Sequence, residues 1–390
     1  MRICVILLSV ALRLLVAVML LIPLTVSNAY ARNAVVQKID GGYLASVTSV
    51  SPAEFWMVGR YFRHSNGPYG LIERWDGDKG SITPTPLPNQ QAAFEDISGT
   101  SPTDVWAVGE RVRGPGWEGQ SALIVHWNGT AWHRVPNPLS ASAGSSLSHV
   151  VAISSTDAWA VGSASGGYSA AFEHWNGRQW STVRESVTGP QGLIKALTAV
   201  SPDDVWAIGQ NYSRQGDAPS VPLIAHWNGK VWAIVPAHDP NAGGGGLGSI
   251  TAINKNDMWA VGGNNDGTET SPLVEHWNGK RWAISPGTES AGGGSWLDNI
   301  NAVPGGDLWA VGESYQPYRP YIQHWNGHLW REVTTPFIGD NNLLTAVAGT
   351  SNRNAWAVGG EPWARATEAV PIEHWNGTVW KLVAGPAPNP

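Results

Sequence analysis

The stretch "DVWAVGERVRGPGWEGQSALIVHWNGTAWHRVP" spans residues 104–136 and decides the fold. Two of its phrases, "WAVG" and "HWNG", return along the whole chain in slightly changed form. The tryptophans of the first phrase are Trp56, Trp106, Trp159, Trp206, Trp259, Trp309 and Trp356. They define seven copies of a unit of about 50 residues, and self-similarity at such a fixed period indicates a repeat architecture.

Two further sets of tryptophans keep the same period. The second set, in the "HWNG" phrase, is Trp75, Trp127, Trp175, Trp227, Trp277, Trp325 and Trp375. The third set, shortly after it, is Trp132, Trp180, Trp232, Trp282, Trp330 and Trp380, and Gly80 stands at its position in the first unit. Of 23 tryptophans, only Trp117, Trp296 and Trp363 lie outside the three sets. We interpret tryptophans at fixed repeat positions as packing elements rather than as a sugar-stacking array.

Each unit contains four short segments with the character of β-strands. In the fourth unit they are "LTAVS" (197–201), "VWAIG" (205–209), "PLIAHW" (222–227) and "VWAIVP" (231–236). The turn "SPDD" joins the first two, and Asn-Gly, which favours a two-residue hairpin turn, joins the last two. No segment has helical periodicity over three turns.

Four such strands bury both sheet faces only when units stack, and closing the stack into a ring removes its end faces. The sequence therefore predicts an all-β fold, a seven-bladed β-propeller of four-stranded repeats. The alternative is an open β-solenoid, which needs polar caps that the sequence lacks. The expected repeats are 44–92, 93–145, 146–192, 193–245, 246–295, 296–341 and 342–390. Residues 34–39, "AVVQKI", are expected either to pair onto the last blade as a clasp or to lie across one face.

The unit resembles the Kelch repeat of galactose-oxidase-type propellers. The likeness lies in the period, the apolar strand ending in glycine, the aromatic on the third strand and "W-x-x-V-P" on the fourth, and it is strongest between Trp259 and Pro286. The "NGxxW" hairpin is also similar to the Asp-box turn of sialidase-type propellers, although tryptophan stands where the box has aspartate. The resemblance implies a fold and not an activity.

The first 31 residues have the features of a secretory signal. Arg2 and Arg13 are the only charges before a mostly apolar run, and Ala29-Tyr30-Ala31 matches the small-x-small cleavage pattern. We expect residues 1–31 to be removed and residues 32–390 to form a single propeller that is secreted, extracellular, periplasmic or at the cell surface. The alternative is a retained membrane anchor.

Composition restricts the function classes. Removing the signal also removes Cys4, the only cysteine, which excludes disulfides, thiol chemistry and the Cys-Tyr copper site known in galactose oxidases. The formal net charge of −6 argues against nucleic acid or anionic membrane as the partner. We expect no cofactor, no metal, no nucleic acid, no membrane contact beyond the signal peptide, and a monomer.

An acid and a base recur beside the tryptophans. The pairs are Asp104 with His126, Asp157 with His174, Asp204 with His226, Asp257 with His276 and Asp307 with His324, then Asn354 with His374 and Glu54 with Arg74. The last pair changes at both positions together, which indicates that acid and base touch. A metal site is the functional alternative. We favour a structural, buried hydrogen-bonded pair in each blade, because equivalent positions lie far apart around a ring.

The variable segments hold the candidate ligand-binding residues. The loops between the second and third strands and those between blades emerge on one face, and variation among copies marks individual roles. The candidates are Tyr61, Arg63, Tyr69, Arg111, Arg113, Trp117, Tyr212, Arg214, Trp296, Tyr315, Tyr318, Arg319, Trp363 and Arg365. Aromatic groups beside charges stack sugars or anchor proteins.

Two functions remain open at this point. The first is a binding propeller for extracellular glycan or protein ligands that performs no catalysis. The second is an extracellular carbohydrate-active enzyme, a glycosidase or lyase, on the same face, for which paired carboxylates in a central pocket are the expected mark. The sequence contains no G-x-S-x-G, H-E-x-x-H or phosphate-loop motif in a suitable context, so the first is preferred.

Overall fold

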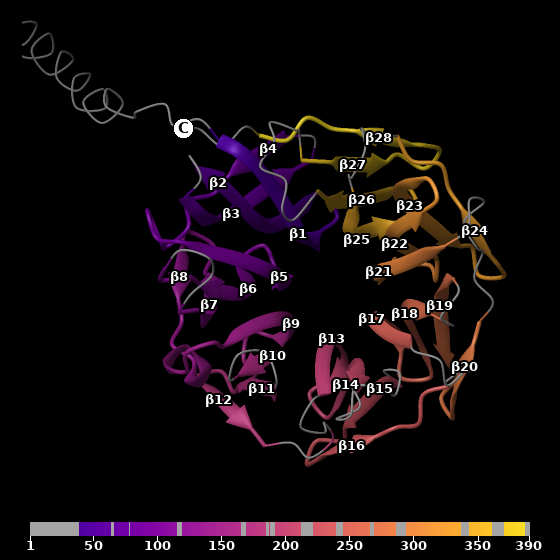
Figure 1. The fold of residues 1–390 in the computed structure, drawn as a ribbon, viewed down its shortest axis with the longest axis horizontal. Coiled ribbons are helices and arrows are strands. Elements are labelled where there is room, and N and C mark those ends of the chain that lie inside the picture. The colour runs from indigo at the N-terminus through magenta and orange to yellow at the C-terminus, as the bar shows by residue number, and fades with distance from the viewer. Residues whose placement is uncertain are drawn as a thin grey trace, which may run out of the picture. The chain divides into compact units, whose positions relative to one another are not determined.

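The chain forms a seven-bladed β-propeller, as predicted. The computed structural model describes residues 39–63, 66–77, 79–114, 119–164, 169–184, 187, 192–211, 221–238, 245–265, 269–285, 294–336, 343–360 and 370–386. These residues form seven four-stranded antiparallel sheets, which Figure 1 shows as blades around a ring. No helix within the described part of the chain is long and apolar enough to cross a membrane. The signal segment, with Cys4, lies outside the described residues.

The first four blades run in chain order. Blade 1 has β1 (Ile39–Ser51), β2 (Glu54–Arg63), β3 (Asn66–Asp76) and β4 (Lys79–Ile82). Blade 2 has β5 (Ala92–Ser101), β6 (Asp104–Arg111), β7 (Ser121–Trp127) and β8 (Trp132–Arg134), followed by the 3₁₀ turn η2 (Pro138–Ala141). Blade 3 has β9 (Ser146–Ser154), β10 (Asp157–Ala164), β11 (Ser169–Trp175) and β12 (Trp180–Val183). Blade 4 has β13 (Gly192–Ser201), β14 (Asp204–Asn211), β15 (Val221–Trp227) and β16 (Trp232–Ile234).

The last three blades repeat the order. Blade 5 has β17 (Gly245–Asn254), β18 (Asp257–Asn265), β19 (Thr270–Trp277) and β20 (Trp282–Ile284). Blade 6 has β21 (Ser295–Ala302), β22 (Leu308–Tyr315), β23 (Tyr318–Trp325) and β24 (Trp330–Glu332). Blade 7 has β25 (Leu344–Ser351), β26 (Asn354–Gly359), β27 (Ile372–Trp375) and β28 (Trp380–Leu382).

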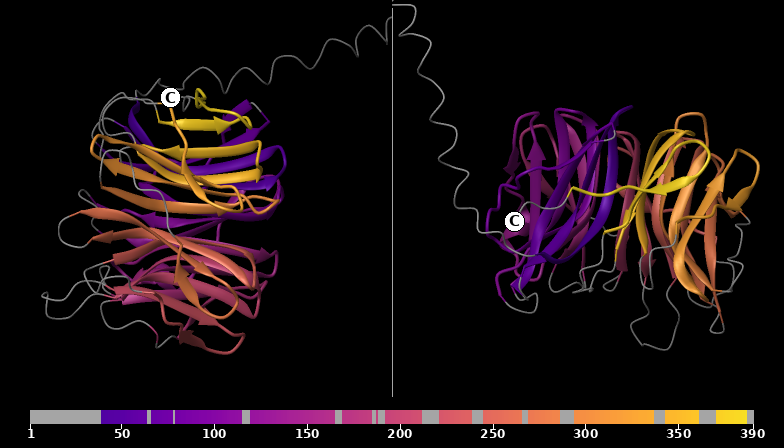
Figure 2. Two further views of the ribbon diagram at one scale, coloured as in Figure 1. Left: turned by 90° about the vertical axis from the view of Figure 1, so that its right-hand side faces the viewer. Right: turned by 90° about the horizontal axis from the view of Figure 1, so that it is seen from above.

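The first strand of every blade lines the centre of the ring, and the fourth lies at the rim (Figure 1). Because neighbouring strands of a blade are antiparallel, their connections emerge alternately on two opposite faces of the ring. Figure 2 shows the ring from the side. We call the face with the connections between strands two and three, and between blades, the loop face. The opposite face, with the turns that join strands one to two and three to four, is the turn face.

The glycine that ends "WAVG" produces a bulge on the innermost strand. In blade 5, a Cβ on Gly262 would lie 1.9 Å from the carbonyl oxygen of Gly246, and the other six equivalent glycines have the same contact at 1.8–2.1 Å. The strand register shifts between Leu247 and Ser249 opposite this glycine. A β-bulge leaves one residue unpaired and turns its side chain out of the ladder. The innermost strand is also longer than predicted, because pairing continues past the bulge.

Tryptophans join each blade to the next, which confirms their packing role. The Trp106 ring of blade 2 lies 5.0 Å from Trp175 and 5.3 Å from Trp180 of blade 3, measured between centroids. The first-set and third-set tryptophans are at most 6 % exposed. Burying such large rings between neighbouring blades contributes apolar area that holds the ring together.

The Asn-Gly connection is not the two-residue hairpin turn that we predicted. In blade 2, Trp127 pairs with Trp132, so four residues connect the strands. The Asn128 side-chain oxygen accepts the N–H groups of Thr130 and Ala131 at 3.0 and 3.1 Å. This side-chain acceptor stabilises the longer loop, in which Gly129 has a positive φ of 93°.

Blades 7 and 1 close the ring without exchanging strands among the described residues. All four strands of each blade are consecutive in sequence. The Thr345 hydroxyl donates to the carbonyl of Leu44 at 2.8 Å, and the Asn354 amide donates to the carbonyl of Pro52 at 3.2 Å. Of the "AVVQKI" segment, only Ile39 is described, and it begins β1 rather than joining blade 7.

Candidate functional site

A pocket of about 380 Å³ lies at the centre of the ring. All seven bulge residues line it: Ala45, Glu95, Ser148, Lys195, Gly248, Asp298 and Thr345. Tyr43, Gln210, Leu247 and Trp296 complete its wall. The bulge position therefore places one different residue from every blade around one space, with Gly248 as the member that has no side chain.

One side of the pocket carries an ion pair beneath an aromatic ring. Arg60 donates to Glu95 at 2.8 Å, and its guanidinium carbon lies 4.8 Å from the centroid of the Tyr43 ring. Burial raises the pKa of Glu95, and the Arg60 guanidinium opposes that shift. Burial and the neighbouring Glu95 charge raise the pKa of the buried Glu110 to about 8.

The other side carries a second acidic group. Burial, and to a smaller extent the Glu313 charge, raise the pKa of Asp298 to about 7 against the opposing effect of the Lys195 ammonium. Glu313 accepts the hydroxyls of Tyr315 at 2.8 Å and Tyr318 at 3.3 Å. The pocket thus has acidic groups on opposite blades and one exposed ammonium between them.

Trp296 is the predicted ligand-binding residue that lies in this pocket. It belongs to the innermost strand β21 and not, as predicted, to a loop between blades. Its ring packs on Gly263, where a Cβ would lie 1.9 Å from Trp296 Cε3. Two more candidates, Tyr315 and Tyr318, stack with ring centroids 6.3 Å apart and donate to Glu313, which is not itself part of the pocket lining.

Other candidates lie outside the pocket, also at strand ends rather than in loops. Tyr61 and Tyr69 pair across β2 and β3 with ring centroids 5.7 Å apart. Arg111 donates to Gln90 at 2.9 Å, and Arg319 pairs with Glu332 at 2.6 Å.

The remaining candidates are only partly described or not described. Arg113 is exposed just after β6, and the backbone of Arg63 pairs within blade 1. Trp117, Tyr212, Arg214, Trp363 and Arg365 lie outside the described residues.

Sequence reasoning missed most of the pocket wall. Tyr43, Glu95, Lys195 and Asp298 all lie in the innermost strands, and none of them was among the residues predicted to bind a ligand. One pattern identifies the bulge residues in retrospect, because each precedes the "WAVG"-type glycine of its unit by the same interval. At that one position the seven copies all differ, although the residue before it is apolar in every blade.

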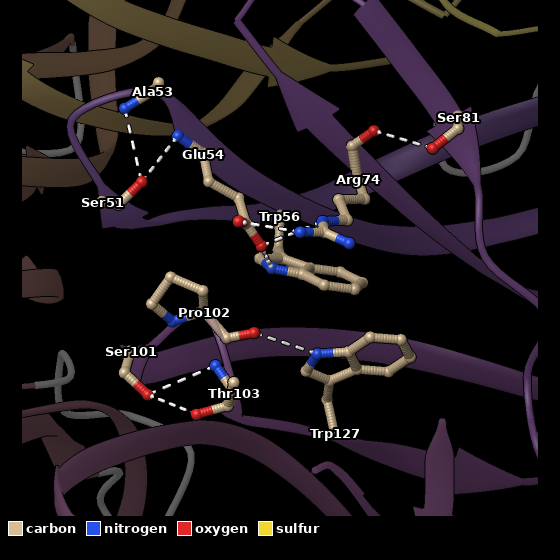
Figure 3. A network of polar contacts seen from close by, with 10 residues as sticks. All are labelled: Ser51, Ala53, Glu54, Trp56, Arg74, Ser81, Ser101, Pro102, Thr103 and Trp127. Atoms are coloured by element: carbon tan, nitrogen blue, oxygen red, sulfur yellow. Dashed lines mark hydrogen bonds and ion pairs between the residues drawn. The ribbon is translucent and has the colours of Figure 1, made fainter. Parts of the chain in front are cut away.

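The two recurring polar residues touch in all seven blades, as an acid and a base in six of them and as Asn354 and His374 in blade 7. The five Asp–His distances lie between 2.7 and 3.2 Å, and His374 lies 2.9 Å from Asn354. In blade 1, Arg74 makes two bonds of 3.0 Å to Glu54, whose carboxylate also accepts the Trp56 indole N–H (Figure 3). The base also lies over the first-set tryptophan, and the ring centroids of His226 and Trp206, which stack, are 4.3 Å apart.

These pairs are less buried than we predicted. The His276 and Asp257 side chains are 34 % and 38 % exposed, because the turn face leaves one side of each pair open to solvent. No group of three or more His, Cys, Asp or Glu side chains that could hold a metal ion occurs within the described part of the chain. The hydrogen bond from His126 lowers the pKa of Asp104.

Replacing Asp204 with alanine is expected to lower the free energy of unfolding by about 1–3 kcal/mol. Its carboxylate accepts the Trp206 N–H at 2.7 Å and contacts His226 at 2.9 Å, and both groups lose their partner. Denaturant unfolding measures the effect, with Asp203→Ala, an exposed substitution in the same turn, as the control. An Asp204→Ala variant that melts like the wild type but loses ligand binding would contradict a structural role.

A buried carboxylate on the third strand accepts hydrogen bonds from the connections between blades. Four blades have it two residues before the second-set tryptophan, as Glu73, Glu173, Glu275 and Glu373. Glu173 accepts the N–H of Leu139 in η2 at 2.9 Å, and Glu275 accepts the N–H of His238 at 3.0 Å. Burial raises the pKa of Glu73, Glu173 and Glu373 to about 7.

Solved structures with the same architecture show the fold of this chain. YCF48 bound to a D1 peptide matches with a TM-score of 0.52 and 12% identity over 84% of this chain and 93% of that one. The GH74 xyloglucanase of Xanthomonas campestris matches with a TM-score of 0.59 and 11% identity over 90% of this chain and 55% of that one.

For a third similar structure, the way in which the propeller ring closes is known. The β-propeller domain of the trilobed protease from Pyrococcus furiosus, which has an open velcro topology, matches with a TM-score of 0.51 and 7% identity over 90% of this chain and 99% of that one. No protein-family model and no curated protein sequence match this chain. Similarity at this level of identity shows a propeller fold and no more.

Proposed function

We propose that this protein is a binding module that holds a glycan or protein ligand in the central pocket and on the surrounding loop face, without catalysis. The observation that carries the proposal is the ring of seven different bulge residues around a pocket of about 380 Å³. A packing role alone favours the same residue in every blade, as the tryptophans and the "WAVG" glycines show.

The chemistry of the wall supports recognition of a polar ligand. Trp296 and Tyr43 offer aromatic surfaces, and Glu95, Lys195 and Asp298 offer charged and hydrogen-bonding groups around one space. Such a mixture suits a sugar ring or a polar peptide segment. YCF48, a propeller that binds a peptide, and a xyloglucanase are both structural neighbours, so each ligand class has a precedent in the fold. We also propose, from the sequence pattern of the repeat, that its unit is related to the Kelch repeat.

Replacing Lys195 with alanine is expected to weaken ligand binding by about tenfold or more, because the only ammonium among the described residues that line the pocket is lost. Xyloglucan oligosaccharides on a glycan array and a random peptide library provide the two probe sets, and calorimetry on the selected probe measures the affinity. Lys230→Ala is the matched control, since Lys230 belongs to the turn face of the same blade.

Trp296→Ala tests the aromatic wall in the same assay and should also reduce affinity. A probe that binds Lys195→Ala and Trp296→Ala as tightly as it binds the wild type would place the site elsewhere. If neither probe set binds the folded wild-type protein, the proposal loses its support.

A carbohydrate-active enzyme is the second candidate, favoured by one observation. Glu95 and Asp298 line the same pocket, and Asp298, with a pKa raised to about 7, retains a proton that a general acid needs near neutral pH. Release of reducing ends from xyloglucan by the wild type, absent in both Glu95→Gln and Asp298→Asn, would establish this alternative over simple binding.

We also propose that the protein acts after export, once residues 1–31 have been removed. The support is the charged start, the apolar run and the Ala29-Tyr30-Ala31 pattern. Mass measurement of the chain purified from a secreting host tests this, since a chain that keeps Met1 and stays with the membrane fraction would indicate an anchor.

A further inference from the structure

Two arginines of blade 2 lie on the same face of its sheet. Arg111 ends β6 and pairs with Ser121 on β7, and Arg134 on β8 pairs with Val125 on β7. Directly opposed residues have their side chains on the same side of a sheet. Ser121 and Val125 are four residues apart on one strand and therefore also share a side. The side chains of Arg111 and Arg134 thus belong to one face of the blade.

A third arginine lies near these two. Arg113 follows the end of β6 and is exposed. Its side chain passes over Gly119, just before β7, where an added Cβ would lie 3.2 Å from Cβ and 4.0 Å from Cδ of Arg113. The three charges act on one another, because burial and then the charges of Arg134 and Arg113 lower the pKa of Arg111. We call Arg111, Arg113 and Arg134 the arginine patch.

No acidic side chain in the described part of the chain pairs with the arginine patch. Arg111 donates to the side-chain oxygen of Gln90 at 2.9 Å, and the other two arginines have no hydrogen bond or ion pair with a described residue. Glu110 precedes Arg111 and therefore has its side chain on the opposite face of the strand. Glu118 lies outside the described residues. Positive charges held near one another without an acid cost free energy, and a bound anion removes that cost.

Two polar atoms at the patch are buried and have no hydrogen-bond partner among the described residues. One is Nε of Arg111, and the other is the hydroxyl oxygen of Ser121, which is 4 % exposed and lies directly opposite Arg111. Buried polar groups are nearly always hydrogen-bonded, so two unpaired ones on opposed residues indicate that an acceptor completes this site. An oxyanion can accept from both an N–H and an O–H group.

We propose that the arginine patch binds a glycan chain that carries sulfate or phosphate ester groups. All three bases are arginine, whose planar guanidinium donates two parallel hydrogen bonds to such an oxyanion. The backbones of Arg111 and Arg134 are two strands apart, roughly 10 Å, so the patch fits a chain with several anionic groups better than one small ion. The formal net charge of −6 disfavours such a chain on the rest of the surface.

The arginine patch is separate from the central pocket. None of its three residues lines that pocket. The inference rests on the proposed function only in taking a glycan as the ligand, and the experiments below distinguish the failure of one from the failure of the other.

Calorimetry on the purified protein with sucrose octasulfate, a sugar with closely spaced sulfate esters, tests the proposal. We expect the wild-type protein to bind this probe and not to bind unsulfated sucrose. The affinity should fall when the salt concentration is raised from about 50 to about 300 mM, because salt screens the interaction between exposed charges. If the folded wild-type protein does not bind sucrose octasulfate, the proposal is wrong.

Three substitutions locate the site. Arg111→Gln should weaken binding of sucrose octasulfate about tenfold, because a half-buried guanidinium makes strong hydrogen bonds to an anion. Arg113→Gln and Arg134→Gln should each weaken it by a smaller factor, since these side chains are exposed. Arg331→Gln is the matched control, because it removes an exposed arginine from the outermost strand of blade 6, and it should bind like the wild type. A loss of the same size in all four folded variants would show that only the overall charge matters and would contradict the proposal.

Further comparisons separate this site from the central pocket and from other ligands. Loss of sucrose octasulfate binding in Lys195→Ala, but not in the arginine variants, would place the anion in the central pocket and overturn the patch while leaving the proposed function intact. Binding at the patch when neutral glycans and peptides fail to bind the pocket would support this inference and not the proposed function. Inorganic sulfate that binds as tightly as the sulfated sugar, or a phosphoserine peptide that binds more tightly, would overturn the assignment to a glycan.

Discussion

Replacing Gly262 with alanine is expected to lower the free energy of unfolding by about 3 kcal/mol or more, a large effect for a single methyl group. The new Cβ would lie 1.9 Å from the Gly246 carbonyl oxygen and 2.9 Å from Leu247 Cα. Both are backbone atoms of the innermost strand, so no side-chain rotation relieves the clash. Relief requires moving the bulge, and with it the contacts of blade 5 with its neighbours.

Guanidinium unfolding followed by far-UV circular dichroism measures the loss for Gly262→Ala. Gly245→Ala is the matched control in the same sheet, because its Cβ would have no neighbour closer than 3.4 Å and its φ is not in the left-handed region. Equal stability of the two variants would show that the innermost strand shifts at little cost and that the bulge is not rigid. The same variant should also alter the pocket wall, since Gly248 is the bulge residue of that blade.

The architecture could be predicted from the sequence because packing repeats with the chain. Every seam needs large apolar rings at equivalent positions, so the tryptophans return with one period, and seven copies follow directly. The contact between acid and base was also accessible, because Glu54 and Arg74 change together in the first unit. The repeated tryptophans thus reflect contacts between neighbouring blades, and the paired changes reflect a contact within one blade.

The pocket was harder to predict because it depends on a departure from the regular strand. In an ideal strand, alternate residues face opposite sides, and Glu95 or Asp298 then counts as one more position of a sheet. The bulge opposite the glycine places that residue out of the ladder and toward the centre of the ring. The bulge is a consequence of close backbone approach, and neither apolar periodicity nor turn residues reveal it.

The buried glutamates should make the protein less stable at alkaline pH. Because the pKa of Glu173 and of Glu373 rises to about 7 in the folded protein, the folded state retains protons that the unfolded state has released. Stability therefore falls as pH rises from about 4.5 to about 7 and stays low above that. The lowered pKa of Asp104 acts only in more acidic solution, so it does not oppose this trend.

The expected result is a free energy of unfolding several kcal/mol lower at pH 8 than at pH 5, with about 2–3 kcal/mol from each of these two glutamates. Glu173→Gln with Glu373→Gln should reduce the difference and make the variant more stable than the wild type at pH 8. Glutamine is compatible with this position, since blade 6 has the fully buried Gln323 there. The reverse substitution, Gln323→Glu, should steepen the pH dependence because it adds one more buried carboxyl. If the double variant keeps the wild-type dependence on pH, the buried glutamates are charged in the folded protein, and their contacts with the connections between blades are ionic.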